Sequence, residues 1–382
     1  LILFRRQRQM CIRDRPRAHR LARTAADQAM ERRAAPPDAI VLGITTGGMD
    51  ITEACLLAGD SRPDRLLRHS LSSVAEDLAE RFHCSGPLLT LSTACSSGAV
   101  AIKLALEMIR AGLARHVLTG GVDGLCRLTY YGFKSLQLLD PAGARPLDQN
   151  RRGMSVAEGA AMLLLESSRG DPLEIAILGA GLSCDAYHPA RPHPDGRGAL
   201  AAMQAALKDA GLDRSCIDYI NLHGTGTTDN DLAEARAIRK LFAENHPPLS
   251  SVKGAMGHTL AAAGAAEAVI AAICIDNQIL PGTTGCRVPD EALGIAPILR
   301  PTPQSMETVL SNSFGFGGNN AAIVIGRPQT DKPAASGTYF PRMRITGWSA
   351  FTGAGDLEAT LDAVAENRSC RGHLAIASIA RN

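Results

Sequence analysis

The stretch Thr90–Leu106, TLSTACSSGAVAIKLAL, joins a short apolar segment to a helical pattern through a turn of small residues. The apolar side chains after the turn recur at helical spacing, and the pattern stops at Gly112. Cys95 lies in the turn. Backbone N–H groups and the positive end of a helix dipole face such a position, so we expect an exposed, nucleophilic thiolate with a lowered pKa. A buried, inert cysteine is the alternative, and it is our interpretation of most other cysteines.

Strand and helix patterns alternate on both sides of this turn. A β-branched run, AIVLGIT, begins at Ala39, and HVLTGGVDG follows at 116–124. Two strands that read as a pair are expected at 159–167 and 174–185. The alternation continues with a helix at 198–212, a strand at 217–224, a helix at 231–244, a helix near Leu260 and a strand at 320–326. The second half therefore repeats the first, which predicts a layered α/β fold with strands buried between helices.

Composition limits the class of protein. The chain has 382 residues, 45% of them hydrophobic, which predicts a soluble protein with a large core. Its formal net charge is +2, so we expect no nucleic-acid partner. The ten cysteines form no C-x-x-C pair, which favours a reducing, cytoplasmic compartment and no metal site. The most apolar stretch, 259–275, is interrupted by Gly264 and Glu267. We interpret it as a buried helix and expect no membrane span.

Three further segments carry side chains suited to catalysis. His223 follows an apolar strand in NLHGTGTTDNDLAEA, although a lone histidine in such a place is more often structural. Lys253 and His258 lie five residues apart on a glycine-bearing turn before a helix. Phe314 and Phe316 lie in a glycine-rich loop, SNSFGFGGNNAAIVIG, before a strand.

Six motifs in one order give the chain a family resemblance. From about Arg17 to Gly326 the chain resembles the β-ketoacyl-acyl carrier protein synthases of the thiolase fold, through TACSSGA, GGVDGLCRLTYYGFKSL, RPLDQNRRGMSVAEGAA, HGTGTTDNDLAEA, KGAMGHTLAAAGAAEA and NSFGFGGNNAA. The resemblance implies a duplicated, layered α-β-α-β-α fold with halves at 17–170 and 171–326. It also implies an acyltransferase that condenses a malonyl group with an acyl chain, with loss of carbon dioxide, in fatty acid, polyene or polyketide synthesis.

The resemblance further implies roles for individual residues. Cys95 would carry the acyl chain, while His223 and His258 would stabilise the enolate and place the protein in the elongating branch. Lys253 and Glu234 would form a supporting charged pair. The oxyanion hole would consist of the N–H groups of Cys95 and Phe316, and the acyl pocket of Met154, Phe314 and Phe316. Asn319 and Met154 depart from the threonine and phenylalanine that the family usually has. No bound cofactor is expected, because substrates arrive on the phosphopantetheine arm of acyl carrier protein.

The resemblance implies an acidic carrier protein as partner, and a homodimer or a heterodimer with a related synthase. Arg62, Arg65 and Arg68 are spaced three apart, so on a helix they would share one face and could form a basic docking patch. A solvated helix face is the alternative interpretation of these arginines.

The ends of the sequence depart from the family. Residues 1–16, with QMCIRDR at 9–15, read as a cloning or sequencing scar or as a native basic tail. The family's opening strand and helix are missing before 17, so we expect an incomplete first half with an uncovered sheet edge. After a linker at 327–342, residues 343–382 resemble that opening and read as the truncated start of a second synthase-like unit. An unrelated tail and a circular permutation are the alternatives. An inactive fragment, or a non-catalytic scaffold that binds carrier protein, is the alternative function.

Overall fold

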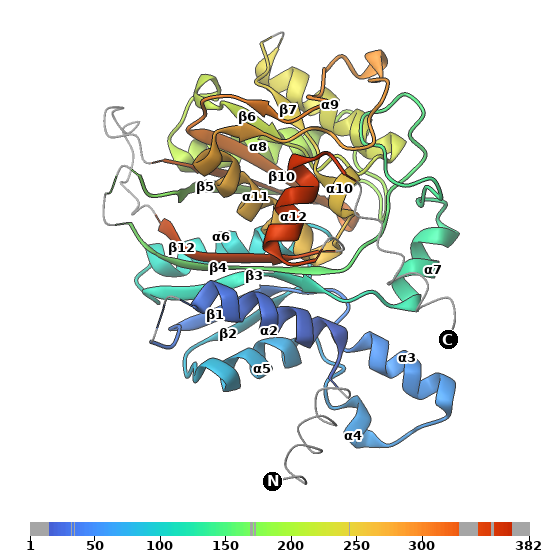
Figure 1. The fold of residues 1–382 in the computed structure, drawn as a ribbon, viewed down its shortest axis with the longest axis vertical. Helices are drawn as coiled ribbons and strands as arrows, with labels where there is room; N and C mark the ends of the chain where they lie inside the picture. The colour runs from blue at the N-terminus through green and yellow to red at the C-terminus, as the bar shows by residue number, and fades with distance from the viewer. Residues whose placement is uncertain are drawn as a thin grey trace.

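The computed structural model describes residues 15–368, except for 32, 34, 169–170, 172, 244, 328–342 and 353–354. The expected scar, the linker and the end of the C-terminal segment therefore lie largely outside the described residues. Within them, ten strands form a single mixed sheet that runs through the whole molecule (Figure 1). A separate ribbon of two strands consists of β8 (Ile279–Leu280) and β9 (Thr302–Pro303).

The first half of the chain contributes four strands and the helices that cover them. The strands are β1 (Ala39–Gly43), β2 (Leu88–Leu91), β3 (His116–Asp123) and β4 (Gly159–Ser167). The covering helices are α2 (Arg17–Met30), α5 (Ser72–Phe82) and α6 (Ser97–Arg110). Three exposed helices project from this half, namely α3 (Met49–Ala58), α4 (Pro63–Leu66) and α7 (Arg127–Ser135).

The second half repeats this arrangement. Its strands are β5 (Ala176–Cys184), β6 (Tyr219–Asn221), β7 (Leu249–Ser250), β10 (Thr308–Gly315) and β11 (Asn319–Gly326). Its helices are α8 (Arg197–Ala210), α9 (Thr228–Phe242), α10 (Lys253–Met256), the 3-10 turn η2 (Leu260–Ala262) and α11 (Ala263–Asn277). Two last elements, β12 (Met343–Phe351) and α12 (Leu357–Ala365), follow the second half.

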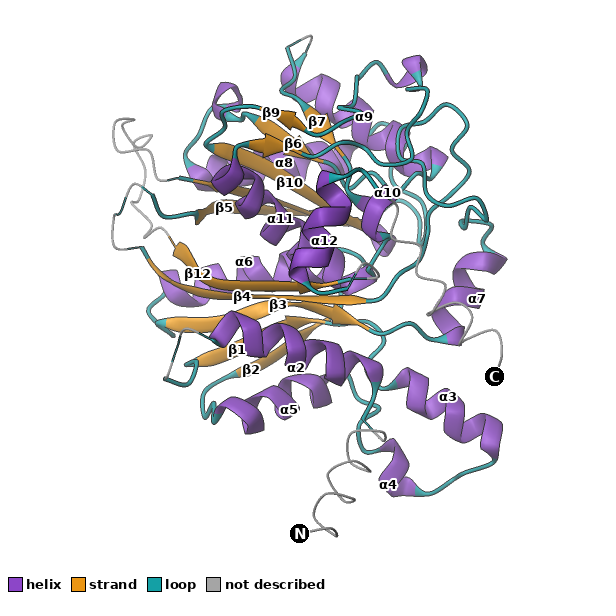
Figure 2. Cartoon of the chain, in the orientation of Figure 1, coloured by secondary structure: helices purple, strands orange, loops and turns teal. Residues whose placement is uncertain are grey.

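Alternating side chains on each strand divide the interior into layers. In β1, Ile40 and Leu42 pack against α2 and α5, whereas Ala39 and Val41 face the opposite way and pack against α6. The outer face of the second half packs against α8 and α9. Helices α6 and α11 lie between the two halves (Figure 2). The predicted layered α-β-α-β-α fold is therefore confirmed.

The apolar stretch near Leu260 is the centre of this layering. Of the described helices, one, Leu260–Asn277, is long and apolar enough to cross a membrane, and 83% of it is buried inside the protein. Its neighbours are α6 and strands from both halves. The prediction of a buried helix is confirmed.

Two expectations about the sheet are wrong. The strand order is β2-β1-β3-β4-β12-β5-β11-β10-β6-β7, so β4 and β5 are not paired but lie on either side of β12. The expected open edge is also absent among the described residues, because β12 runs antiparallel to β4 from Met343 opposite Ser167 to Phe351 opposite Ala160. In the first half β12 takes the position that β5 takes in the second. Strand pairing between distant segments is a tertiary property that local patterns do not contain.

The contacts of β12 are specific. Gly347 passes so close to α2 that a Cβ atom there would lie 2.0 Å from the Ala29 carbonyl oxygen. Arg344 forms ion pairs with Glu166 on β4 and Glu174 beside β5. In this structure the segment thus belongs to the common sheet, while its origin as the start of a second synthase-like unit stays a prediction.

Candidate active site

The turn before α6 holds Cys95 rigidly. Ala94 has a left-handed backbone with φ of 54°, an uncommon conformation for a residue with a side chain. Ser97 Oγ stabilises the turn by donating to the Ala94 carbonyl at 2.6 Å and accepting from the Thr93 N–H at 2.8 Å. The backbone N–H groups of Cys95 and Phe316 point at the Cys95 sulfur. The two predicted oxyanion-hole donors therefore converge on the predicted nucleophile.

The predicted lowering of the Cys95 pKa is wrong. Cys95 is only 6% exposed, and burial raises the pKa of its thiol to about 12. The nearby Asp123 carboxylate acts in the same direction, while Lys253 and the two N–H groups oppose it only in part. Removal of water from the sulfur outweighs the effect of the helix terminus. The resting nucleophile is a neutral thiol.

His223 and His258 meet from two separate loops. Their ring centroids are 5.4 Å apart with the planes nearly perpendicular, and both side chains are buried. Lys253 Nζ donates to His223 Nδ1 at 3.3 Å, and the Leu260 N–H donates to His258 Nδ1 at 3.3 Å. Each Nδ1 is thus an acceptor, so the proton of each neutral ring is on Nε2.

Both histidines are held in the neutral form. Burial is the main cause that lowers the pKa of His223 and of His258 well below the usual value, and the Lys253 ammonium adds to it in each case. At neutral pH each ring is therefore a hydrogen-bond donor through Nε2–H and carries no charge.

The predicted pair of Lys253 with Glu234 is wrong. Lys253 forms its ion pair with Glu267 on α11, and both side chains are almost completely buried. Glu234 instead accepts hydrogen bonds from the N–H groups of His223 and Gly224, each at 2.9 Å, and from the Asn312 side chain at 3.0 Å. Burial raises the pKa of both glutamates to about 7. Glu234 thus fixes the backbone that carries His223, and Glu267 fixes the lysine.

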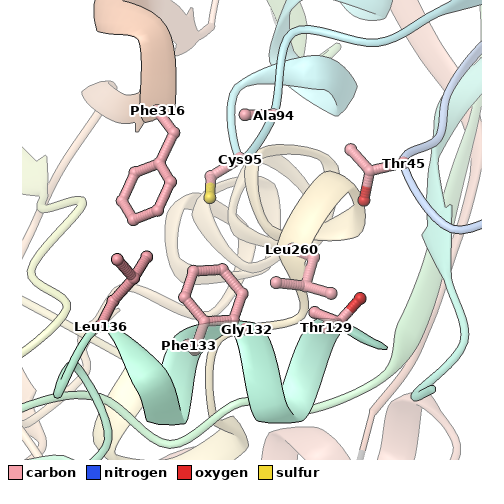
Figure 3. Close-up of a pocket in the computed structure, with 9 residues that line it drawn as sticks. All are labelled: Thr45, Ala94, Cys95, Thr129, Gly132, Phe133, Leu136, Leu260 and Phe316. Atoms are coloured by element: carbon pink, nitrogen blue, oxygen red, sulfur yellow. The ribbon is translucent and has the colours of Figure 1, made fainter. Parts of the chain in front are cut away.

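Two cavities meet at Cys95. One, of about 320 Å³, is mainly apolar and is lined by Thr45, Ala94, Cys95, Thr129, Gly132, Phe133, Leu136, Leu260 and Phe316 (Figure 3). The other, also about 320 Å³, contains both histidines and the predicted pocket residues Met154, Phe314 and Phe316. Its wall also bears polar side chains, among them Arg152, Arg191, Thr225 and Thr227. Phe133 and Phe316 line both cavities, and their ring centroids are 5.5 Å apart.

Comparison with known proteins agrees with this geometry. The family "Beta-ketoacyl synthase, N-terminal domain" matches residues 10–170, and "Beta-ketoacyl synthase, C-terminal domain" matches residues 175–287. The chain belongs to the β-ketoacyl synthase family. It is 36% identical over 259 residues to 3-oxoacyl-acyl-carrier-protein synthase 2 of Mycobacterium tuberculosis, a match that covers 64% of this chain and 62% of that relative. The synthase 2 of Rhizobium meliloti is 34% identical over 311 residues, covering 75% of this chain and 73% of the relative.

Solved synthase structures share the fold. The ishigamide ketosynthase/chain length factor has a TM-score of 0.76 and 31% identity, covering 83% of each chain. A ketosynthase in complex with its chain length factor from Xenorhabdus doucetiae has a TM-score of 0.73 and 37% identity, covering 82% of each chain. A type II polyketide synthase acyl-carrier protein complex with its ketosynthase has a TM-score of 0.75 and 28% identity, covering 82% of this chain and 85% of that one.

The predicted docking arginines do not share a helix face in this chain. Helix α4 is a single turn, Pro63–Leu66, so Arg62 precedes it and Arg68 follows it. Arg62 forms a bidentate pair with Asp60, and Arg65 lies 3.8 Å from the same carboxylate. Asp60 therefore offsets part of the positive charge of this surface. Pro63 is the first residue of α4 and Asp64 lies in its first turn, so the helix begins only after Arg62 and ends before Arg68.

Sequence reasoning missed several residues of the synthase site. Glu267 was visible as the one charged residue in the alanine-rich stretch 259–275, fourteen positions after Lys253. Asn319, noted only as a departure from the family, donates from its side chain to the Phe316 carbonyl at 3.1 Å and so holds the turn that follows Phe316. Thr45 lies shortly after β1, and Asp123 is the last residue of β3. No local pattern in the sequence marked either residue.

Proposed function

We propose that this synthase catalyses the decarboxylative condensation of a malonyl group on acyl carrier protein with an acyl chain held on Cys95. The main support is the convergence of Cys95, two backbone N–H groups and two neutral histidines whose protons are on Nε2. This arrangement provides a nucleophile, an oxyanion hole and a separate pair of donors for an enolate.

The first half-reaction transfers the acyl chain. The Cys95 sulfur attacks the carbonyl carbon of the acyl thioester, and the N–H groups of Cys95 and Phe316 stabilise the developing oxyanion. The bond between that carbon and the carrier's sulfur then breaks. The proton of the Cys95 thiol ends on the departing carrier thiol. Because burial raises the Cys95 pKa to about 12, this proton must leave the sulfur during the attack and not before it.

The second half-reaction forms the carbon–carbon bond. The Nε2–H groups of His223 and His258 donate to the carbonyl oxygen of the malonyl thioester. As carbon dioxide leaves, its bonding electrons form an enolate at that oxygen, and the α-carbon attacks the acyl group on Cys95. Cys95 departs as a thiolate and takes up one proton. Neutral histidines suit this step, since an imidazolium would protonate the enolate more readily.

The two cavities match the two parts of the substrates. The apolar cavity beside Cys95 suits an acyl chain. The cavity with Thr225, Thr227, Arg152 and Arg191 offers hydroxyl and cationic groups for a phosphopantetheine arm. We therefore propose that the second cavity receives the phosphopantetheine arm of acyl carrier protein. We expect no bound cofactor.

A dimer is supported by an apolar surface on the projecting arm of α3 and α4. Leu56, Leu57 and Leu67 are 77%, 64% and 75% exposed. Such a surface is costly in water unless another protein covers it. A similar ketosynthase was solved in complex with its chain length factor. We propose a second copy or a related synthase as the covering partner, in the cytoplasm, where the eight described cysteines, all free, would stay reduced.

The function is tested by separating the half-reactions. His223→Ala and His258→Ala should each lower carbon dioxide release from malonyl carrier protein at least about a hundredfold, because the enolate loses a donor. Both variants should still acylate Cys95. Cys95→Gln should do the reverse, losing acylation while still releasing carbon dioxide. Wild-type decarboxylation in both histidine variants would contradict the enolate role, and a wild-type protein inactive in both half-reactions would favour the non-catalytic scaffold.

A further inference from the structure

We propose that Asp123 is a positioning residue for the decarboxylation step, which holds the turn carrying His258 against the strand that ends beside Cys95. This inference rests on the proposed function. It assigns a task to a buried carboxylate that takes no direct part in the chemistry derived above.

Asp123 is the last residue of β3 and is completely buried. Its Oδ1 accepts hydrogen bonds from the Thr45 N–H at 2.8 Å, the Thr46 N–H at 2.7 Å and the Thr46 hydroxyl at 2.8 Å. Its Oδ2 accepts from the Thr45 hydroxyl and from the Ala261 N–H at 2.9 Å. One carboxylate therefore ties the loop after β1 to the turn before α11. Each of its five donors comes from one of those two segments.

Both tied segments border the reacting groups. Thr45 and Leu260 line the apolar cavity together with Cys95. Leu260 has a left-handed φ of 55°, and its N–H is the donor that sets the tautomer of His258. A non-glycine residue in this conformation is strained and persists only where neighbouring contacts impose it. The strained residue is Leu260, and the Ala261 N–H that donates to Asp123 belongs to the next residue in the chain.

Other segments of the chain contact this turn on two sides. On one side the His258 N–H donates to the Ser155 carbonyl at 2.7 Å, and the Ala157 N–H donates to the His258 carbonyl at 2.9 Å. On the other side Gly121 lets β3 approach so closely that a Cβ there would lie 2.3 Å from the Ala261 oxygen. Asp123 thus lies two residues after this close contact on β3, and it holds the Ala261 end of the turn that carries His258.

The substitution Asp123→Asn removes this link selectively. The amide oxygen should stay at the Oδ1 position, where two backbone N–H groups and a hydroxyl require an acceptor. The amide nitrogen would then face the Ala261 N–H, and these two groups cannot form a hydrogen bond because both are donors. The Thr45 hydroxyl can rotate and accept a hydrogen bond from the amide nitrogen. The His258 turn would lose its tie, but the Cys95 turn would keep its own hydrogen bonds.

The test measures carbon dioxide release from malonyl carrier protein per site, with sites counted by the amplitude of Cys95 acylation. This count removes any loss due to unfolded protein. Asp123→Asn should lower decarboxylation per site about tenfold or more and keep KM for malonyl carrier protein within about threefold. The acylation rate should not fall, because the substitution removes a carboxylate that raises the Cys95 pKa. Thr46→Val, which removes one donor and keeps the carboxylate, should give a smaller loss of about threefold and supplies the test if Asp123→Asn does not fold.

The matched control is Asp148→Asn. Asp148 is also buried and accepts from the N–H groups of Asn150, Arg287 and Val288, but it lines neither cavity. The control should lose stability without changing decarboxylation per site. Wild-type decarboxylation per site in Asp123→Asn, or in Thr46→Val if that variant alone folds, would overturn the positioning role. Absence of decarboxylation in the wild-type protein would instead overturn the proposed function itself.

Discussion

At the scale of single residues, burial and not sequence neighbourhood sets the state of the nucleophile. Small residues and a helix terminus around Cys95 predicted a thiolate, and the nucleophilic role of the residue stays a prediction. The sign of its pKa shift was wrong because burial of the sulfur depends on residues from distant parts of the chain, among them Phe316 and Leu260.

The raised pKa reverses the expected order of alkylation. With iodoacetamide at pH 8, exposed Cys184 should react before Cys95, because the Cys95 thiolate is scarce when its pKa is about 12. The rate at Cys95 should rise about tenfold per pH unit between pH 8 and 10, as the thiolate fraction does below the pKa. Mass mapping of timed samples measures both. If Cys95 were the first cysteine labelled at pH 8, the neutral resting thiol would be refuted.

Charged partners at this scale were equally hard to assign from the sequence. Lys253 and Glu234 were predicted to pair with each other, but each has a different partner. Glu267 is fourteen residues from Lys253, so only the tertiary packing of α11 brings them together. Motifs gave the residues of the site, while the fold decided which of them pair.

At the scale of secondary-structure elements, local patterns predicted most of the helices and strands. Apolar runs placed β1 and β3, and helical spacing placed α6 and α8, within a few residues. Helix α4 was misjudged because Arg62, Arg65 and Arg68 fit a helical period that the chain keeps for one turn only. The position of β12 between β4 and β5 was not predictable, since it depends on strand order and not on any local signal.

The place of β12 under α2 makes a prediction about Gly347. A valine there would drive its Cβ into the Ala29 carbonyl, so Gly347→Val should lower the free energy of unfolding by about 1–3 kcal/mol or more. Thr346→Val, one residue earlier, loses only a 3.2 Å hydrogen bond to the Leu164 carbonyl and should cost about 1 kcal/mol. Urea unfolding followed by circular dichroism compares the two. Equal midpoints for Gly347→Val and the unchanged protein would show that β12 does not pack there.

At the scale of the whole molecule, duplication explains where the site lies. Each half has the same strand order and directions, and the central helices α6 and α11 lie back to back between them. Cys95 lies in the turn before α6 in the first half, while His223, Lys253 and His258 belong to the second half, Lys253 at the start of α10 and the two histidines in loops. Alternating strand and helix patterns predicted the layers and the repeat. They did not predict the depth at which the two halves bury the reacting groups, and that depth sets every pKa shift described for the site.

The central claim is that Cys95 carries an acyl group that is then joined to a malonyl-derived carbon. The most direct measurement is intact-protein mass spectrometry on the protein first loaded with acyl carrier protein thioester and then mixed with malonyl carrier protein. We expect an acyl adduct on Cys95 that disappears as a β-ketoacyl carrier protein, two carbons longer than the starting acyl chain, appears in equal amount. An adduct on another cysteine, or one that persists while carbon dioxide is released, would contradict the account.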